Sequence, residues 1–398
     1  MLGFPVDIPG LPTNERNLGI LDTKLALAWT KRNIAAFGGD PARITAFGES
    51  VGAAMIDLIA LTSSENDPPF QAMIMESGSY YLPRWGAGVV APITTGTGGD
   101  PSSAPVAKSL GCEWNNTVLN CLRKDSLTTA DYKRALNDGN NGAFGAWSPI
   151  DDGGLTVPAN YNGHGVRTGK RGAKIPMLTG TNANEAITFA YFDYLFGINL
   201  TWRNFFDGRF PELKQFGDEA NITKAYAFIN RESVDARGHT REWFQATQAI
   251  TDYMYTCLSA REARANTDAG VKTWRYIYNT SSSLGQDLFH DPSPHGYELP
   301  QVFGTYNPSG ALNQQKKISA VIMKAWADFA KDPHGTGPGW DAYSGSNEPV
   351  AHLGADRSAG VLAVRPSSET DKVCALFQRA YDNKDPPATN KRKRHFVA

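Results

Sequence analysis

Apolar and polar positions alternate along this chain in two periods, one typical of strands and one typical of helices. Short runs of β-branched and apolar residues predict buried strands, and apolar positions three or four residues apart predict helices. Strand, helix and strand follow one another, which favours a parallel sheet with crossover helices and therefore an α/β fold. The predicted elements are a helix over 17–37, a strand over 43–47, a helix over 53–59, strands over 72–75, 174–180 and 271–278, and a helix over 318–331.

Two long segments interrupt this pattern. Residues 80–161 are rich in Gly, Pro, Ser and Thr, and we expect an excursion from the sheet that walls a pocket, with an amphipathic piece at 118–122. Residues 191–265 have a mostly helical pattern with many aromatics, and we interpret them as a helical cap. The basic end, 383–398, predicts a disordered tail, so that 1–382 forms one α/β domain.

The stretch from Arg43 to Ala54 joins a predicted strand to a predicted helix through Gly-Glu-Ser-Val-Gly. A G-x-S-x-G pattern at such a turn is typical of a nucleophile elbow, which exposes its serine at the top of a sheet. We expect Gly48 and Gly52 to allow the sharp turn and a close approach of the helix, leaving Ser50 accessible. The start of the helix then points free N–H groups at negative charge that develops beside Ser50.

Two further polar side chains follow predicted strands. Glu185 lies just beyond the strand over 174–180, and His295 lies in the loop after the strand over 271–278. Because parallel sheets place ligands at the carboxyl ends of their strands, Ser50, Glu185 and His295 can converge although they are far apart in the sequence. A serine hydroxyl needs an imidazole, with a pKa near ~6.5, to take its proton, and a carboxylate orients that imidazole.

Each of the three residues also has an ordinary structural explanation. The serine could be a helix cap, the glutamate an acid in the first turn of a helix, and the histidine a loop residue. His290 is a rival for the base, and Asp151 or Asp152 is a rival for the acid. Spacing alone leaves these alternatives open.

The bulk composition excludes some classes of partner. The chain has 398 residues, 41% hydrophobic and 20% charged, with a formal net charge of −1. A nearly neutral chain offers no basic field, so we expect no nucleic-acid partner. No apolar run reaches about eighteen residues, which predicts no membrane span, and the first residues lack the charged and apolar regions of a signal peptide.

Cysteines and glycosylation sequons nevertheless favour the secretory pathway. Cys112 and Cys121 are spaced for a small disulfide-closed loop, and Cys257 and Cys374 remain as a possible second pair. An even number of cysteines together with several sequons predicts a secreted, extracellular glycoprotein. The sequons lie at Asn115, Asn199, Asn221 and Asn279.

Short blocks of sequence carry a resemblance to a known family. In their order and spacing they resemble the successive blocks of the type-B carboxylesterase/lipase family, the cholinesterase-like branch of the α/β-hydrolases, from about Asn17 to Cys374. The blocks are Leu18–Asp22, Phe37–Pro41, Phe47–Gly52, Glu76–Ser79, Gly180–Asn182 with Glu185, and His295–Pro300 with Val302–Gly304.

Carried over position by position, the resemblance implies a triad. Ser50 would be the nucleophile, Glu185 the acid and His295 the base of a serine carboxylic-ester hydrolase. Only His295 has the Gly-Tyr-Glu-Leu-Pro continuation, which disfavours His290.

The resemblance also implies further features. The fold would be an α/β-hydrolase fold, with a mostly parallel central sheet, flanking helices and a helical cap region. Disulfides Cys112–Cys121 and, less directly, Cys257–Cys374 are implied. No metal or organic cofactor is needed, and the partners would be small neutral esters or lipids.

The sequence departs from the family pattern at its beginning. Family members take two oxyanion donors from a glycine-rich loop, which is missing here, and a third would be the N–H of Val51, where the family usually has alanine. Met1–Phe4 resembles a block that the family reaches only after that loop. We therefore expect an N-terminally truncated form that lacks several early strands and a signal peptide. The strand bearing Ser50 would then be an exposed edge.

Two alternatives to an active esterase follow from this departure and from the fold. One is a non-catalytic binding or adhesion homologue, and the other is an inactive fragment without the oxyanion glycines. All three triad residue types are present, which favours the esterase.

Overall fold

The computed structural model describes residues 8–79, 103–137, 149, 152, 154–157, 173–195, 197, 200–229, 239–280, 293–306, 313–344, 348–356 and 360–383. At the centre of these residues is a six-stranded sheet with its strands in sequence order. The first five strands are parallel, and the sixth pairs antiparallel with the fifth. The strands are β1 (Thr45–Glu49), β2 (Ala72–Glu76), β3 (Met177–Asn182), β4 (Thr273–Tyr278), β5 (Pro349–Asp356) and β6 (Gly360–Pro366).

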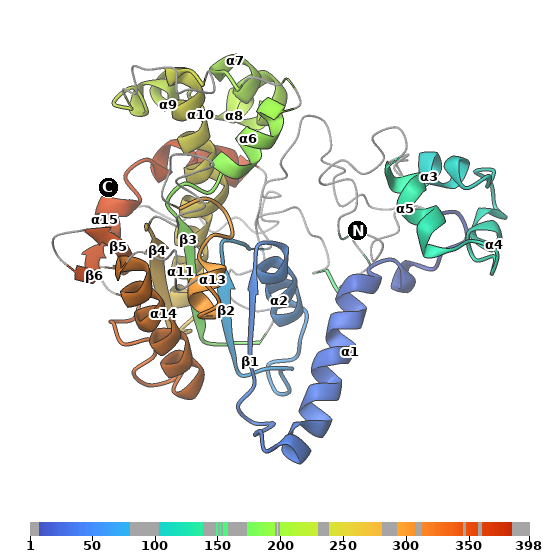
Figure 1. The fold of residues 1–398 in the computed structure, drawn as a ribbon, viewed down its shortest axis with the longest axis horizontal. Coiled ribbons are helices and arrows are strands. Elements are labelled where there is room, and N and C mark those ends of the chain that lie inside the picture. Colours follow the sequence, from blue (N-terminus) through green and yellow to red (C-terminus); the bar gives the residue numbers. More distant parts are fainter. Residues whose placement is uncertain are drawn as a thin grey trace, which may run out of the picture.

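Helices connect the parallel strands and cover both faces of the sheet (Figure 1). The prediction of a mostly parallel α/β fold is confirmed, although sequence reasoning missed β5, β6 and several short helices. The α-helices are α1 (Leu18–Asn33), α2 (Val51–Leu61), α3 (Ser103–Ser109), α4 (Val118–Leu122), α5 (Thr129–Asn137), α6 (Ile187–Leu195), α7 (Trp202–Asn204), α8 (Pro211–Phe216), α9 (Glu219–Ala225), α10 (Arg241–Thr251), α11 (Cys257–Asp268), α13 (Leu299–Val302), α14 (Asn313–Lys331), α15 (Ser367–Thr370) and α16 (Gln378–Asn383). Two π-helical turns are η4 (Phe205–Arg209) and η5 (Asp252–Thr256), and the 3-10 turns are η1 (Thr13–Glu15), η2 (Ile34–Phe37) and η6 (Cys374–Leu376).

The two faces of the sheet bury two separate apolar cores. On β2 all five residues are buried; Met73 and Met75 join the core formed with α2, α10 and η5, whereas Ile74 joins the core formed with α14. On β4 the alternating Trp274 and Tyr276 point to the α14 side. Since both faces are covered, the central strands β2, β3 and β4 are buried at every position and carry no alternation of buried and exposed positions.

The segment expected to be a cap is only partly one. Helices α6 to α9 lie together at one end of the sheet, beyond the carboxyl ends of the strands (Figure 1). In contrast, α11 packs directly on β3 and β4, so it is the crossover helix between those strands. A helical pattern does not distinguish a cap helix from a crossover helix, because both bury one face.

The strand that precedes Ser50, β1, lies at an open edge of the described sheet. β1 pairs with β2 on one side, as expected for an edge strand, and Phe47 in β1 is exposed. The helix predicted over 17–37 forms as α1 and η2, but its apolar stripe is not buried: Leu25 is 63% and Trp29 51% exposed, and Ile20 alone is buried within α1. In Figure 1, α1 lies beside α2 at this edge, with little of the fold on its outer side.

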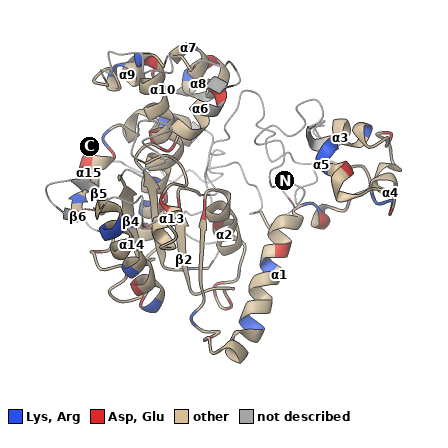
Figure 2. Ribbon diagram, viewed as in Figure 1, with Lys and Arg blue, Asp and Glu red and all other residues tan. Residues whose placement is uncertain are grey.

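Charged residues of both signs lie on the described helices (Figure 2). In α1, Asp22 is followed by basic residues only, and α14 carries mainly lysines with Asp328 among them. No helix among the described residues is long and apolar enough to cross a membrane. Within the same residues, no group of three or more His, Cys, Asp or Glu is placed to hold a metal ion.

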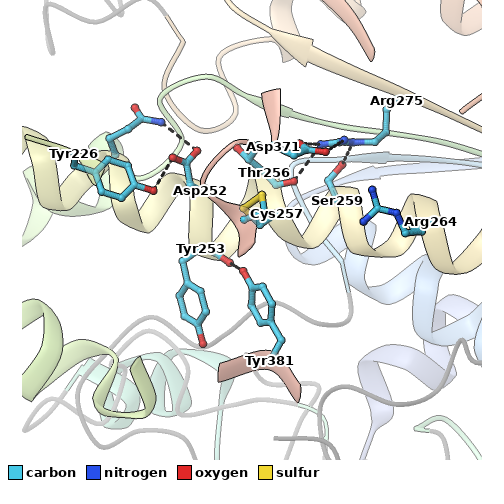
Figure 3. The surroundings of a disulfide bond; sticks show 12 residues. Tyr226, Asp252, Tyr253, Thr256, Cys257, Ser259, Arg264, Arg275, Asp371 and Tyr381 are labelled. Carbon is cyan, nitrogen blue, oxygen red and sulfur yellow. Dashed lines mark hydrogen bonds and ion pairs between the residues drawn. A yellow bond between two sulfur atoms is a disulfide. The ribbon is translucent and has the colours of Figure 1, made fainter. Parts of the chain in front are cut away.

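Two disulfides join the cysteines in the pairs suggested by the resemblance. Cys112–Cys121 closes a loop in the α3–α5 region, and Cys257–Cys374 ties the start of α11 to η6 near the C-terminal end of the fold. Figure 3 shows the second disulfide beside the buried ion pair of Arg275. The tail expected over 383–398 lies, apart from Asn383, outside the described residues.

Candidate active site

The G-x-S-x-G sequence forms a tight turn between β1 and α2. Ser50 lies between the two elements with φ 57° and ψ −118°, a backbone region that residues other than glycine rarely occupy. Its amide donates to the carbonyl oxygen of Glu76, at the end of β2, over 2.8 Å. The neighbouring parallel strand therefore holds the turn, and the strain is concentrated at Ser50 on the carboxyl edge of the sheet.

Two glycines make room for this turn, and one of them lies outside the motif. A Cβ on Gly48 would lie 2.5 Å from the backbone of Gly52, and a Cβ on Gly78 would lie 2.1 Å from the carbonyl oxygen of Ser50. A Cβ on Gly52 would meet nothing within 4 Å, so the expectation that this glycine is needed for close approach is wrong. Gly78 has that role, because the end of β2 packs beneath the turn.

Glu185 and His295 meet at the same edge of the sheet. Nδ1 of His295 lies 2.6 Å from Oε2 of Glu185, and Oε1 of Glu185 accepts the amide of Asn182 over 2.6 Å. Glu185 is fully buried, and the side chain of His295 is 10% exposed. A buried carboxylate on Nδ1 fixes the tautomer of the ring and leaves Nε2 as the nitrogen that can accept a proton.

The loop that carries His295 is anchored to the end of β3. The side-chain amide of Asn182 donates to the carbonyl oxygen of Pro294 over 2.8 Å. The backbone amide of Asn184 donates to the carbonyl oxygen of Ser293 over 3.1 Å. The turn that carries Glu185 and the loop that carries His295 thus form one hydrogen-bonded unit. The two residues are 110 positions apart in the chain.

Two aromatic rings flank the imidazole. The ring centroid of Phe189, in α6, lies 5.0 Å from that of His295, and the ring of Tyr255, in η5, lies 5.3 Å away. Both rings limit the access of water to the Glu185–His295 pair, which strengthens its electrostatic interaction.

Nε2 of His295 faces Glu49, the residue that directly precedes Ser50. Oε1 of Glu49 lies 3.2 Å from Nε2. Nε2 has no hydrogen-bond partner among the described residues, so no bond between Ser50 and His295 is formed in this structure. Such bonds are often long before substrate binds. The structure therefore brings His295 to Glu185 and to the neighbour of Ser50, and the contact with Ser50 itself stays a prediction.

The alternative acid and base do not join this group among the described residues. Asp152 is buried, and its carboxylate accepts the hydroxyl of Thr156 over 2.6 Å and the side-chain amide of Asn17 over 3.3 Å. It therefore fixes a local turn near α1. Asp151 and His290 lie outside the described residues.

Val51 begins α2 directly after Ser50. Its side chain is 63% exposed, and the first hydrogen bond of the helix runs from the amide of Ala54 to the carbonyl oxygen of Ser50 over 3.1 Å. The first N–H groups of a helix have no acceptor within the helix. The amide of Val51 is therefore suited to donate to an oxygen bound beside Ser50.

Comparison with known families decides the affiliation of this chain. A sequence model of the carboxylesterase family matches residues 2–372. The chain belongs to the carboxylesterase family. Membership implies the α/β-hydrolase fold, in agreement with the mostly parallel sheet, and the family and its relatives point to hydrolysis of carboxylic esters.

Several curated relatives align over most of this chain. Secreted lipase 5 of Gibberella zeae is 30% identical over 350 residues, which cover 84% of this chain and 56% of the lipase. An acetylcholinesterase of Bungarus fasciatus is 27% identical, with 94% and 61% covered, and a cholinesterase of Mus musculus is 28% identical, with 90% and 59% covered. The chain thus spans less than two thirds of the length of these relatives.

Sequence reasoning missed further acids in this region: Glu49 and Glu298, which act on His295, and the buried Glu76 beside Glu49. Glu49 and Glu76 are opposite each other at the ends of the neighbouring strands β1 and β2. Burial raises the pKa of Glu49, and it raises that of Glu76 to about 7. Glu298, which binds the side chain of Asn182, has its pKa raised well above the usual range by burial. The signal available in the sequence was the position of two glutamates at the ends of adjacent predicted strands.

Glu185, Glu49 and Glu298 act on the imidazole of His295 through their negative charge. Burial lowers the pKa of His295, but the negative charges of Glu185 and Glu49 outweigh burial and raise it to about 9. The arrangement favours a positively charged imidazole, which is the state that a general base reaches after it accepts a proton.

Proposed function

We propose that this carboxylesterase hydrolyses neutral carboxylic esters, including lipid esters, through an acyl-enzyme on Ser50. The observation that carries the proposal is the Glu185–His295 pair at 2.6 Å, placed at the carboxyl edge of the sheet beside the strained Ser50 turn. Glu185 and His295, which are 110 residues apart in the chain, serve no evident packing purpose by meeting beside this turn.

The proposed mechanism uses the pair in two steps. His295 takes the hydroxyl proton of Ser50 as the serine attacks the ester carbonyl, and then gives that proton to the leaving alcohol. Water repeats the sequence, releasing the acid. Glu185 holds the ring and stabilises its charged state, while the amide of Val51 donates to the oxyanion.

Labelling with a fluorophosphonate tests the proposal. We expect covalent labelling of the folded chain at Ser50, with loss of the label in Ser50→Ala and slow labelling in Glu185→Gln. Turnover of short-chain p-nitrophenyl esters should fall by about 10³-fold or more in Ser50→Ala and His295→Ala. Absence of labelling in folded protein would instead favour a binding homologue or a fragment without sufficient oxyanion donors.

We also propose that the protein is a secreted glycoprotein. The two disulfides and the exposed sequon asparagines Asn115 and Asn221 support this, as does the similarity to a lipase named as secreted. Asn279 is half-buried, and Asn199 lies outside the described residues. After expression through a eukaryotic secretory pathway, a glycan-removing enzyme should reduce the apparent mass. Asn115→Gln with Asn221→Gln should abolish most of that change; an unchanged mass would contradict the proposal.

A further inference from the structure

A cavity of about 650 Å³ lies behind the turn that carries Glu185. Its walls come from α10, η5, the segment 226–229 and the segment 369–373. Asn184 and Ile187, which flank the acid turn, also line it. A cavity of this size has room for a small organic molecule.

The interior of the cavity contains one carboxylate. Asp252 begins η5, and its Oδ2 accepts the hydroxyl of Tyr226 over 2.8 Å, while its Oδ1 accepts the side-chain amide of Gln248 over 3.4 Å. Figure 3 shows Tyr226 and Asp252 pointing toward each other. Asp252 is partly exposed, and it lines the cavity.

Asp252 forms no ion pair among the described residues, and the exposed Lys372, which also lines the cavity, does not pair with it. The buried guanidinium of Arg275 pairs instead with Asp371 at 2.8 Å. Burial raises the pKa of Asp252 to about 6, so the group is ionised at neutral pH. A desolvated negative charge without a cation is unfavourable, and a bound cation would relieve this cost.

The remaining surface of the cavity is suited to an apolar body. Phe244 and Ile187 are almost fully buried in its wall, and the ring of Tyr226 stands next to the carboxylate. Phe228, which is 76% exposed, lies at the solvent side. Aromatic faces beside a carboxylate attract an ammonium group by cation–π interaction.

We propose that this cavity binds a small organic amine, with its ammonium group on the carboxylate of Asp252 and its apolar body against Phe244 and Ile187. The site is separate from Ser50 and His295 and does not depend on the proposed ester hydrolysis. It adjoins the acid turn, since the hydroxyl of Thr251, another lining residue, accepts the amide of Ala186 over 3.1 Å.

Other charged groups face the cavity and bear on its pH dependence. Asp371, bound to Arg275, raises the pKa of Asp252 further, and the exposed Glu369 and Lys372 line the cavity with opposite charges. Tyr226 stays neutral, because burial and Asp252 raise its pKa well above the usual range. Asp252 is therefore the group expected to govern cation binding between about pH 5 and about pH 7.

The test measures binding of 2-phenylethylamine by isothermal titration calorimetry, with the neutral isostere 2-phenylethanol as a matched probe. We expect saturable binding of the amine and at least about tenfold weaker binding of the alcohol. The affinity of the amine should weaken about tenfold from pH 7 to pH 5, as Asp252 becomes protonated around its pKa of about 6. Equal binding of both probes, or no saturable binding of the amine, would overturn the proposal.

Variants locate the amine. Asp252→Asn, which preserves the shape of the side chain, should remove the preference for the amine, and Thr247→Met, which places a larger side chain in the cavity wall, should weaken binding of both probes. If Asp252→Asn does not fold, Thr247→Met decides the outcome. Glu49→Gln is the control for a cation bound beside His295. Binding that is not weakened in Thr247→Met and disappears in Glu49→Gln would place the amine at the triad and refute the cavity site.

Discussion

Ser50 stores backbone strain at the carboxyl edge of the sheet. Its φ of 57° is unfavourable for serine, by about 1–3 kcal/mol. The hydrogen bond from the Ser50 amide to the carbonyl oxygen of Glu76, together with the close packing of Gly48 and Gly78, holds the residue in that conformation. The benefit of such a turn is that it presents the hydroxyl at the edge of the sheet with the start of α2 beside it.

The two motif glycines should respond differently to substitution. Gly48→Ala forces a Cβ to 2.5 Å from the Gly52 backbone and should destabilise the fold by about 3 kcal/mol. Gly52→Ala meets open space at the start of α2 and should change stability by less than about 1 kcal/mol. Urea unfolding of both variants checks this, and equal losses would show that the packing at Gly48 is not decisive.

The charge of His295 sets the pH range in which its ring can act as a base. Its raised pKa of about 9 means that the ring is mostly protonated at neutral pH and gains its base form as pH rises. Glu49→Gln removes a negative charge that stabilises the protonated ring, so the pKa should fall and the acidic limb of the pH–rate profile should move to lower pH. Initial rates of ester hydrolysis across pH measure this shift. Glu113→Gln, at an exposed position, should leave the limb unmoved; a limb that moves upward in Glu49→Gln would contradict the assignment.

At the scale of elements, η5 connects the cavity that Asp252 lines with the surroundings of His295. This single π-helical turn carries Asp252, which lines the cavity, and Tyr255, which packs on His295. Two contacts fix the position of η5. One is the disulfide Cys257–Cys374, and the other is the hydroxyl of Tyr381, which donates to the carbonyl oxygen of Tyr253 over 2.5 Å. These contacts join η5 to η6 and α16, the last elements of the described chain.

The two disulfides should therefore contribute unequally to stability. The cysteines of Cys257–Cys374 are 117 residues apart, whereas those of Cys112–Cys121 are 9 apart. Loop-closure entropy gives about 5 kcal/mol for the long loop and about 2.5 kcal/mol for the short one. Denaturant unfolding of Cys257→Ala/Cys374→Ala and of Cys112→Ala/Cys121→Ala compares them. A larger loss from the short-loop pair would argue against the entropic explanation.

At the scale of the whole molecule, the edge strand β1 exposes an apolar side chain near the site. Phe47, which is 46% exposed, packs on Phe303 with ring centroids 5.8 Å apart. Unpaired strand edges with apolar side chains favour association with other chains. Helix α1, which carries the exposed Leu25 and Trp29, contacts α2, the helix that follows β1.

We expect concentration-dependent self-association of the chain through this edge. Phe47→Lys should reduce it, since a lysine on an edge strand opposes pairing with another strand. Light scattering after size-exclusion chromatography measures the change. Trp114→Lys removes an exposed aromatic residue far from any strand and is the matched control. If both variants associate like the unchanged chain, the β1 edge is not responsible.

The sequence by itself determined the alternation of strands and helices, the parallel sheet and the nucleophile turn, because these depend on periodicity and on short-range glycine and serine patterns. It also placed Glu185 and His295 after strands. It left β5 and β6 undetected, and it could not separate α11 from the cap, since buried segments of several kinds share one apolar pattern.

Tertiary structure alone decided the rest. That Gly78, and not Gly52, makes room for Ser50 depends on how closely β2 packs beneath the turn. That Glu49 faces His295, and that Asp252 lines a cavity without forming an ion pair among the described residues, depends on which distant segments become neighbours. Packing of residues far apart in the chain sets these contacts, so no local pattern in the sequence records them.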